Sequence, residues 1–229
     1  MAADNHQILT LFEDGSADLM NAAYLGEYSA IVIDAISVAF SRLLPSLLPP
    51  TEHPVDEADL YKKFKVEHDR RTEQATGFFQ AGGILVVRMH PETDIVWWGG
   101  PMSQELDRFG IGAWWKGQIE LDWVTDTYPG DGHSVEILQP DHPFAAVIGS
   151  GPEYTARFAY DIDAYGKGTV LARNRSGDAI AAEFDISPGK IICVQSGCDA
   201  EVLGATLRTH LDDIRGSDTE ILLPEEDEL

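Results

Sequence analysis

The chain has 229 residues, 44% of them hydrophobic, which is enough to bury the core of one large domain or two small ones. Its 39 Asp and Glu outnumber its 16 Lys and Arg and give a net charge of −23, a surface that repels nucleic-acid phosphates and anionic lipids. Two cysteines form no disulfide framework, and neither a transmembrane run nor a signal peptide is evident, so we expect a cytoplasmic protein.

Strands and helices alternate in the first part of the chain. Short apolar runs predict buried strands at residues 7–12, 29–35 and 84–89. Helical patterns precede or follow them at residues 16–26, 36–48 and 56–80. The pair Gly82-Gly83 is typical of a helix that ends in a left-handed cap.

The middle of the chain is less regular. Its apolar and aromatic runs predict short strands at residues 95–98 and 135–138, a helix at 103–115 and a short turn or helix at 144–148. Residues 124–133 are rich in Asp, Gly, Thr and Pro, which indicates a loop.

The last third consists of strands separated by turns, then a helix. Strands are predicted at residues 157–160, 169–173, 179–186 and 190–195, and a final helix at 199–215. The fold expected is therefore α/β: a flavodoxin-like, mostly parallel sheet with helices on both faces and a β-hairpin insert in the C-terminal third. We expect one domain over residues 1–215 and an acidic, disordered tail over 216–229.

Several short motifs occur in the order found in a known family. They are residues 78–87 (FFQAGGILVV), 141–143 (DHP), 171–177 (LARNRSG), 179–184 and 188–195 (PGKIICVQ). This order resembles the class I glutamine amidotransferase-like superfamily, in particular its trehalose-utilisation-protein-like branch. The resemblance spans most of residues 7–215.

The resemblance implies a nucleophilic cysteine on a sharp turn directly after the central strand. Here that turn reads Arg88-Met-His-Pro-Glu92 and contains neither Cys nor Ser. Pro91 also removes a backbone donor that an oxyanion site would use. No counterpart of the family's activating His-x-Glu pair is evident. We therefore expect no glutaminase activity.

Four other residues are candidates for catalysis. Cys198 opens the last helix, where a thiol pKa is often lowered, although neighbouring Asp199 opposes ionisation. Glu13, Asp34 and His90 end predicted parallel strands, where open α/β sheets place their ligand crevice.

Two further groups of residues suggest binding. Oxygen and nitrogen ligands for a divalent metal are available at Asp131, His133, Asp141 and His142, but no fixed spacing distinguishes them from ordinary loop polarity. Two adjacent pairs, Trp97-Trp98 and Trp114-Trp115, form either a core layer or a binding patch. Because neighbours on a strand point to opposite faces, at least one member of each pair is expected to escape the core.

Two functions follow from these patterns. The first is a non-catalytic amidotransferase-like domain that binds a protein partner or another copy of itself, without a cofactor. The alternative is a hydrolase or sugar-modifying enzyme with a site around His90, in which case a small molecule also binds.

Overall fold

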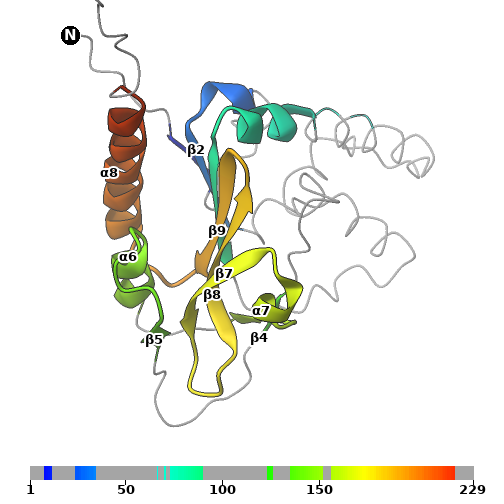
Figure 1. Ribbon diagram of the computed structural model, residues 1–229, viewed down its shortest axis with the longest axis vertical. Helices are drawn as coiled ribbons and strands as arrows, with labels where there is room; N and C mark the ends of the chain where they lie inside the picture. The colour runs from blue at the N-terminus through cyan, green and yellow to red at the C-terminus, as the bar shows by residue number, and fades with distance from the viewer. Residues whose placement is uncertain are drawn as a thin grey trace, which may run out of the picture.

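A computed structural model describes residues 8–11, 24–34, 66, 70, 73–89, 123–125, 135–151 and 156–219 (Figure 1). Its main feature is a seven-stranded sheet with the order β1-β2-β3-β9-β8-β7-β5. The strands are β1 (Ile8–Leu11), β2 (Ala30–Asp34), β3 (Ile84–Met89), β5 (Glu136–Ile137), β7 (Gly168–Arg173), β8 (Ala179–Ile186) and β9 (Gly189–Gln195).

The sheet has a parallel half and an antiparallel half. Strands β1, β2, β3 and β9 pair in parallel, whereas β9, β8, β7 and β5 pair antiparallel. The predicted strands at 84–89 and 179–186 coincide with β3 and β8. The chain therefore has a mixed α/β fold, in which the strands predicted at 169–173, 179–186 and 190–195 extend the main sheet.

The central strands are apolar because both of their faces are buried. Along β3, Ile84 and Val86 join one hydrophobic cluster, while Leu85, Val87 and Met89 join another. A strand with one solvent-exposed face would alternate apolar and polar residues instead. The continuous apolar run of β3 therefore correctly indicated a strand that is buried on both faces.

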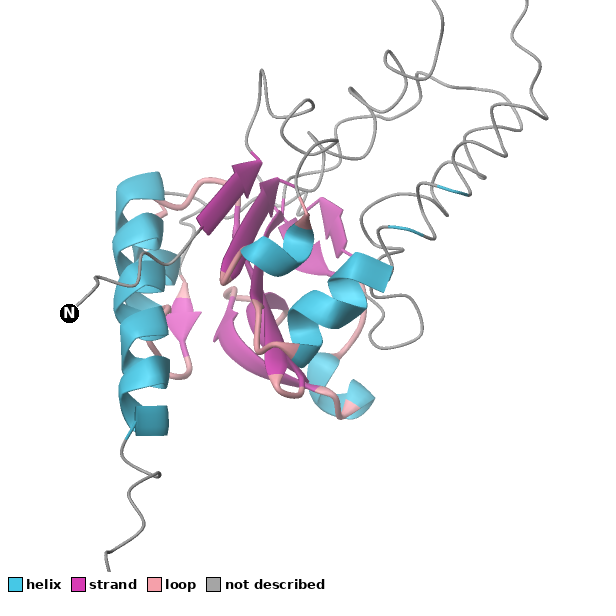
Figure 2. Cartoon of the chain, turned by 90° about the horizontal axis from the view of Figure 1, so that it is seen from above, coloured by secondary structure: helices cyan, strands magenta, loops and turns pink. Residues whose placement is uncertain are grey.

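Each cluster also contains residues from helices. Helices α6 (Ala145–Ser150) and α8 (Ala200–Thr219) contribute Val147, Leu203, Leu207 and Leu211 to the cluster of Ile84, and the long α8 lies beside the sheet (Figure 2). The i, i+4 spacing of the three leucines places them on one side of α8. The helix at residues 73–80 contributes Ala75, Phe78 and Phe79 to the other cluster.

The predicted hairpin between residues 157–160 and 169–173 is wrong. Strand β6 (Ala156–Phe158) instead pairs antiparallel with β4 (Trp123–Thr125), in a separate two-stranded sheet. The helix α7 (Ile162–Tyr165) follows β6, because the Asp161 carboxylate accepts hydrogen bonds from the first helical N–H groups. Because β4 includes residues 124–125, the predicted loop begins too early.

Helix ends account for the remaining differences. Gly82 has φ +79°, and the N–H groups of Gly82 and Gly83 donate to the carbonyls of Phe79 and Phe78, which confirms the predicted left-handed cap. The final helix runs to Thr219, four residues beyond its predicted end, because a single Gly216 weakens a helix by about 1 kcal/mol without ending it.

Other predicted helices are described in part or lie outside the described residues. Residues 25–27 form a 3₁₀ turn, η1 (Leu25–Glu27), whereas 16–23 lie outside. The predicted elements at 36–48, 95–98 and 103–115 also lie outside the described residues. In the described part of the chain, no helix is both long enough and apolar enough to span a membrane.

Candidate functional site

Asp34, Arg88 and Cys198 lie at the carboxyl end of the parallel strands. Asp34, the last residue of β2, is the register partner of Arg88 on β3, and Arg88 is in turn the partner of Val194 on β9. Neighbouring strands lie about 4.8 Å apart, so the backbones of Asp34 and Arg88 are adjacent. Cys198 follows β9 at the same end of the sheet.

Arg88 connects β3 to the turn that follows β9. Its Nη2 donates a hydrogen bond to the carbonyl oxygen of Ser196, and its guanidinium also bonds the side chain of Cys198. Sequence reasoning missed this role of Arg88. A charged residue inside the otherwise apolar run ILVVRM was the indication that could have revealed it, since a part-buried arginine requires partners.

The Cys198 side chain is buried, with 6% of its surface exposed. Burial raises the pKa of its thiol from the ordinary value of 9.0. The charge and hydrogen bond of Arg88 act in the opposite direction, and the charge of Asp199 raises the pKa further, as its position in the sequence suggests. At neutral pH the thiol is therefore protonated, which disfavours a nucleophilic role.

The first amides of α8 are occupied by a carboxylate. Asp199 Oδ1 accepts hydrogen bonds from the N–H groups of Glu201 at 2.8 Å and Val202 at 3.0 Å, as a helix N-cap does. The N–H of Asp199 itself donates to Ser150 Oγ at 3.0 Å. The N–H groups of Glu201 and Val202 could stabilise a thiolate at the start of a helix, but here they donate to the carboxylate of Asp199.

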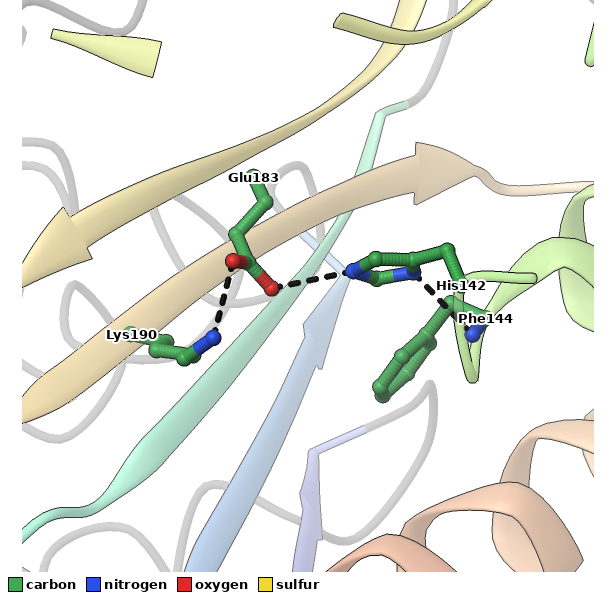
Figure 3. Close-up of polar contacts among 4 residues, drawn as sticks. All are labelled: His142, Phe144, Glu183 and Lys190. Carbon is green, nitrogen blue, oxygen red and sulfur yellow. Dashed lines mark hydrogen bonds and ion pairs between the residues drawn. The ribbon is translucent and has the colours of Figure 1, made fainter. Parts of the chain in front are cut away.

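A second polar cluster lies on the strands β8 and β9 (Figure 3). Glu183 on β8 accepts a hydrogen bond from Lys190 Nζ at 2.9 Å, and its other carboxylate oxygen lies 3.1 Å from His142 Nε2. The remaining ring nitrogen of His142 accepts from the Phe144 N–H at 3.2 Å. Because Nδ1 is an acceptor, the proton of the neutral ring sits on Nε2 and is donated to Glu183.

This environment keeps Glu183 ionised. Burial alone would raise the pKa of Glu183, but the hydrogen bonds from His142 and Lys190 and the charge of Lys190 lower it to about 2. His210 on α8 contacts the same region through the ring of Phe144, with centroids 6.1 Å apart. Burial lowers the pKa of His210, and so does the charge of Lys190. The cluster holds a fixed negative charge between basic groups.

The structure describes only some of the predicted metal and binding residues. Asp141 is exposed, and both ring nitrogens of its neighbour His142 are used in hydrogen bonds. Within the described ranges, no group of three His, Cys, Asp or Glu side chains is arranged to hold a metal ion. The other predicted residues lie outside the described part: Glu13, His90, Asp131, His133, Trp97, Trp98, Trp114 and Trp115.

No protein-family model matches the sequence, and no curated protein matches it. What the chain does must therefore be inferred from the chemistry of the two polar clusters and from the arrangement of the sheet.

Proposed function

We propose that the chain is a non-catalytic, amidotransferase-like subunit that binds a protein partner or a second copy of itself. The observation that carries this proposal is the state of Cys198. It is the candidate nucleophile whose side chain is described, and it is buried, protonated and hydrogen-bonded to Arg88. A catalytic cysteine needs the opposite conditions: partial exposure and a lowered pKa.

The contacts of Cys198 and Arg88 instead support a structural role. Together they hold the end of β3 against the turn between β9 and α8, where Ser196 also bonds the backbone of Met89 through its N–H at 2.9 Å. These hydrogen bonds stabilise the carboxyl end of the sheet and require no catalytic activity of Cys198. The net charge of −23 favours a partner that presents a basic surface, and a cytoplasmic location fits this proposal.

The proposal also includes membership of the amidotransferase-like family and a flavodoxin-like strand order. Four adjacent parallel strands, β1, β2, β3 and β9, support it. One feature differs: the flavodoxin order places the second strand outside the first, whereas β1 here lies outside β2 in the described sheet.

Affinity purification from the organism that makes this chain, followed by native mass measurement, tests the binding role. The expected result is a stoichiometric complex with another protein or a defined homo-oligomer. Cys198→Ala should leave that assembly intact, since the thiol performs no chemistry. A monomer with no partner at physiological concentration would contradict the proposal.

Thiol labelling tests the non-catalytic part of the proposal separately. Iodoacetamide should modify Cys198 much more slowly in the native protein than in urea, because both burial and protonation protect it. Cys193, whose thiol pKa is also raised by burial, is the second reactive group, and Cys193→Ala isolates the signal of Cys198. Rapid labelling of native Cys193→Ala protein would show a reactive thiol and overturn this part.

One observation favours the alternative, a hydrolase or sugar-modifying enzyme. Asp34 and Arg88 are adjacent at the carboxyl ends of parallel strands, where open α/β sheets bind their ligands, and His90 follows β3 in the sequence. This alternative predicts hydrolysis of a small substrate, detected in a broad hydrolase screen and lost in His90→Ala. Activity that persists in His90→Ala would exclude His90 as its catalytic residue.

A further inference from the structure

A pocket of about 260 Å³ lies beside the small β4–β6 sheet, and no residue of either polar cluster lines it. It is bordered by the end of β6, the start of α7 and the turn that joins β7 to β8, and Figure 1 shows α7 and β4 next to this hairpin. The residues that matter for recognition are Arg157, Phe158, Tyr160, Arg173, Gly177 and Asp178.

One wall of the pocket is fixed by Arg173. Its Nη1 donates to the carbonyl oxygen of Gly177, and its Nη2 pairs with Asp163 Oδ2 at 2.5 Å. Gly177 has φ +87°, a left-handed conformation that few other residues adopt, so the turn presents its backbone carbonyl to Arg173. Arg173 is thus a positioned part of the wall whose two Nη groups are already engaged.

Aromatic rings form the adjacent part of the wall. Tyr160 lies with its ring centroid 6.1 Å from that of Phe158 and 5.3 Å from that of Tyr165. These ring contacts hold Tyr160 in place at the edge of the pocket, where a small apolar group can pack against it.

Arg157 is less engaged than Arg173. Within the described residues, its ion pair is with Asp178, and the distance from Nε to Oδ2 is 3.9 Å, beyond hydrogen-bond length. Asp178 Oδ2 instead accepts a hydrogen bond from Asn174 Nδ2 at 3.2 Å. The guanidinium of Arg157 therefore has donors available to a ligand in the pocket.

Two facts define the ligand. A guanidinium fork matches a carboxylate, which accepts two parallel hydrogen bonds. The whole chain carries −23, so a free anion is repelled on approach, and Asp178 beside Arg157 favours a positive group at short range. A molecule with a carboxylate and an ammonium group, neutral overall, satisfies both conditions.

We propose that this pocket binds a small amino-carboxylate zwitterion, with the carboxylate on Arg157 and the ammonium group toward Asp178. A volume of 260 Å³ is below the range usual for drug-sized ligands, so the ligand has the size of a single amino acid. The apolar part of such a ligand packs against Tyr160. This inference is independent of any protein partner.

NMR titration of the full chain with L-alanine, L-phenylalanine, propionate and ethylamine tests the proposal. Saturable shifts at the backbone amides of residues 157–161 and 177–179 are expected with at least one amino acid. Propionate lacks the ammonium group and ethylamine the carboxylate, so both should bind at least ~10-fold more weakly. No saturable shift with either amino acid, or equal binding of propionate or ethylamine, would overturn the proposal.

Substitutions assign the binding to Arg157. Arg157→Ala should raise Kd at least ~10-fold, because charge-assisted bidentate bonds are lost. Arg175→Ala is the matched control: Arg175 lies in the turn between β7 and β8, is exposed and does not line the pocket, so Kd should not change. Arg157→Lys, which keeps the charge without the fork, replaces Arg157→Ala if that variant fails to fold. An unchanged Kd in a folded Arg157 variant overturns the assignment.

Discussion

Glu183 introduces a charge into a strand whose other residues are mostly apolar and buried. Its side chain is 16% exposed, and its carboxylate is bonded by Lys190 on the next strand and by His142 from the loop before α6. A carboxylate in this position is retained only with partners that replace its lost water. Its contacts therefore join three segments that are distant in sequence.

Glu183→Gln should destabilise the fold by about 1–2 kcal/mol, because an amide loses the charge-assisted bonds to Lys190 and leaves that ammonium without its counter-charge. Urea denaturation measures this difference in the free energy of unfolding. Asp185→Asn, an exposed carboxylate two positions along the same strand, is the control and should change stability by less than about 0.5 kcal/mol. Equal effects of both variants would show that the cluster contributes no specific stability.

The same residue predicts a pH dependence. Glu183 has a pKa of about 2 in the folded protein and an ordinary value of 4.5, so folding favours its ionised form. Its contribution is fully present above pH 4.5 and is lost as the pH falls from 4.5 toward 2. The stability difference between wild type and Glu183→Gln, measured by urea denaturation at several pH values, should therefore shrink over this window. Other carboxylates titrate there too, but they are common to both proteins and cancel in the difference.

At the scale of single elements, the helix at residues 73–80 offers a matched pair of glycines. Gly82 has φ +79° at its end, whereas Gly77 lies on its exposed side, where a methyl group added at its Cα would meet no atom within 4 Å. An alanine at position 82 is strained in the left-handed region, and Gly82→Ala should destabilise the protein by about 1–2 kcal/mol. Gly77→Ala should instead stabilise it by about 0.5–1 kcal/mol, because alanine is the better helix former.

Thermal unfolding of the two variants separates these effects. The midpoint temperature should fall for Gly82→Ala and rise for Gly77→Ala, although the chemical change is the same. Changes of the same sign in both variants would contradict the helix end described for residues 78–83. Because the two positions belong to one helix, a general tolerance of that segment to alanine cannot explain opposite signs.

At the scale of the whole molecule, local patterns predicted elements better than they predicted contacts. β3 and β8 were predicted at their observed bounds, because continuous apolar runs between turn residues specify buried strands. The partner of β6 was not, since β4 has three residues and lies more than 30 positions earlier. Arg88 and Ser196 are 108 positions apart, so no local pattern in the sequence brings them together.

The candidate site shows the same division. The strand-end positions of Asp34 and Cys198 followed from the order of strands and helices, which places the ends of parallel strands at one edge. The partners that decide their chemistry, Arg88 for Cys198 and Glu183 for His142, depend on packing between distant segments. Sequence reasoning therefore located residues at this edge without determining the protonation state of the thiol.

Gln195 hydrogen-bonds strands of both sheets, beside the ring contact between Phe158 and Phe184, and its removal tests that connection. Its buried amide accepts from the Ala156 N–H and donates to the carbonyls of Ala156 on β6 and Ile180 on β8. Gln195→Met keeps the length of the side chain but leaves these backbone groups without partners, so we expect a loss of roughly 2–4 kcal/mol in urea denaturation. Gln139→Met, at an exposed position, should cost less than about 0.5 kcal/mol.

Hydrogen exchange in Gln195→Met should also accelerate at the amides of residues 156–158 before the rest of the sheet, because β6 is attached to β8 through the Gln195 side chain. Uniform acceleration across β3, β8 and β9 would instead show that β6 unfolds together with the main sheet.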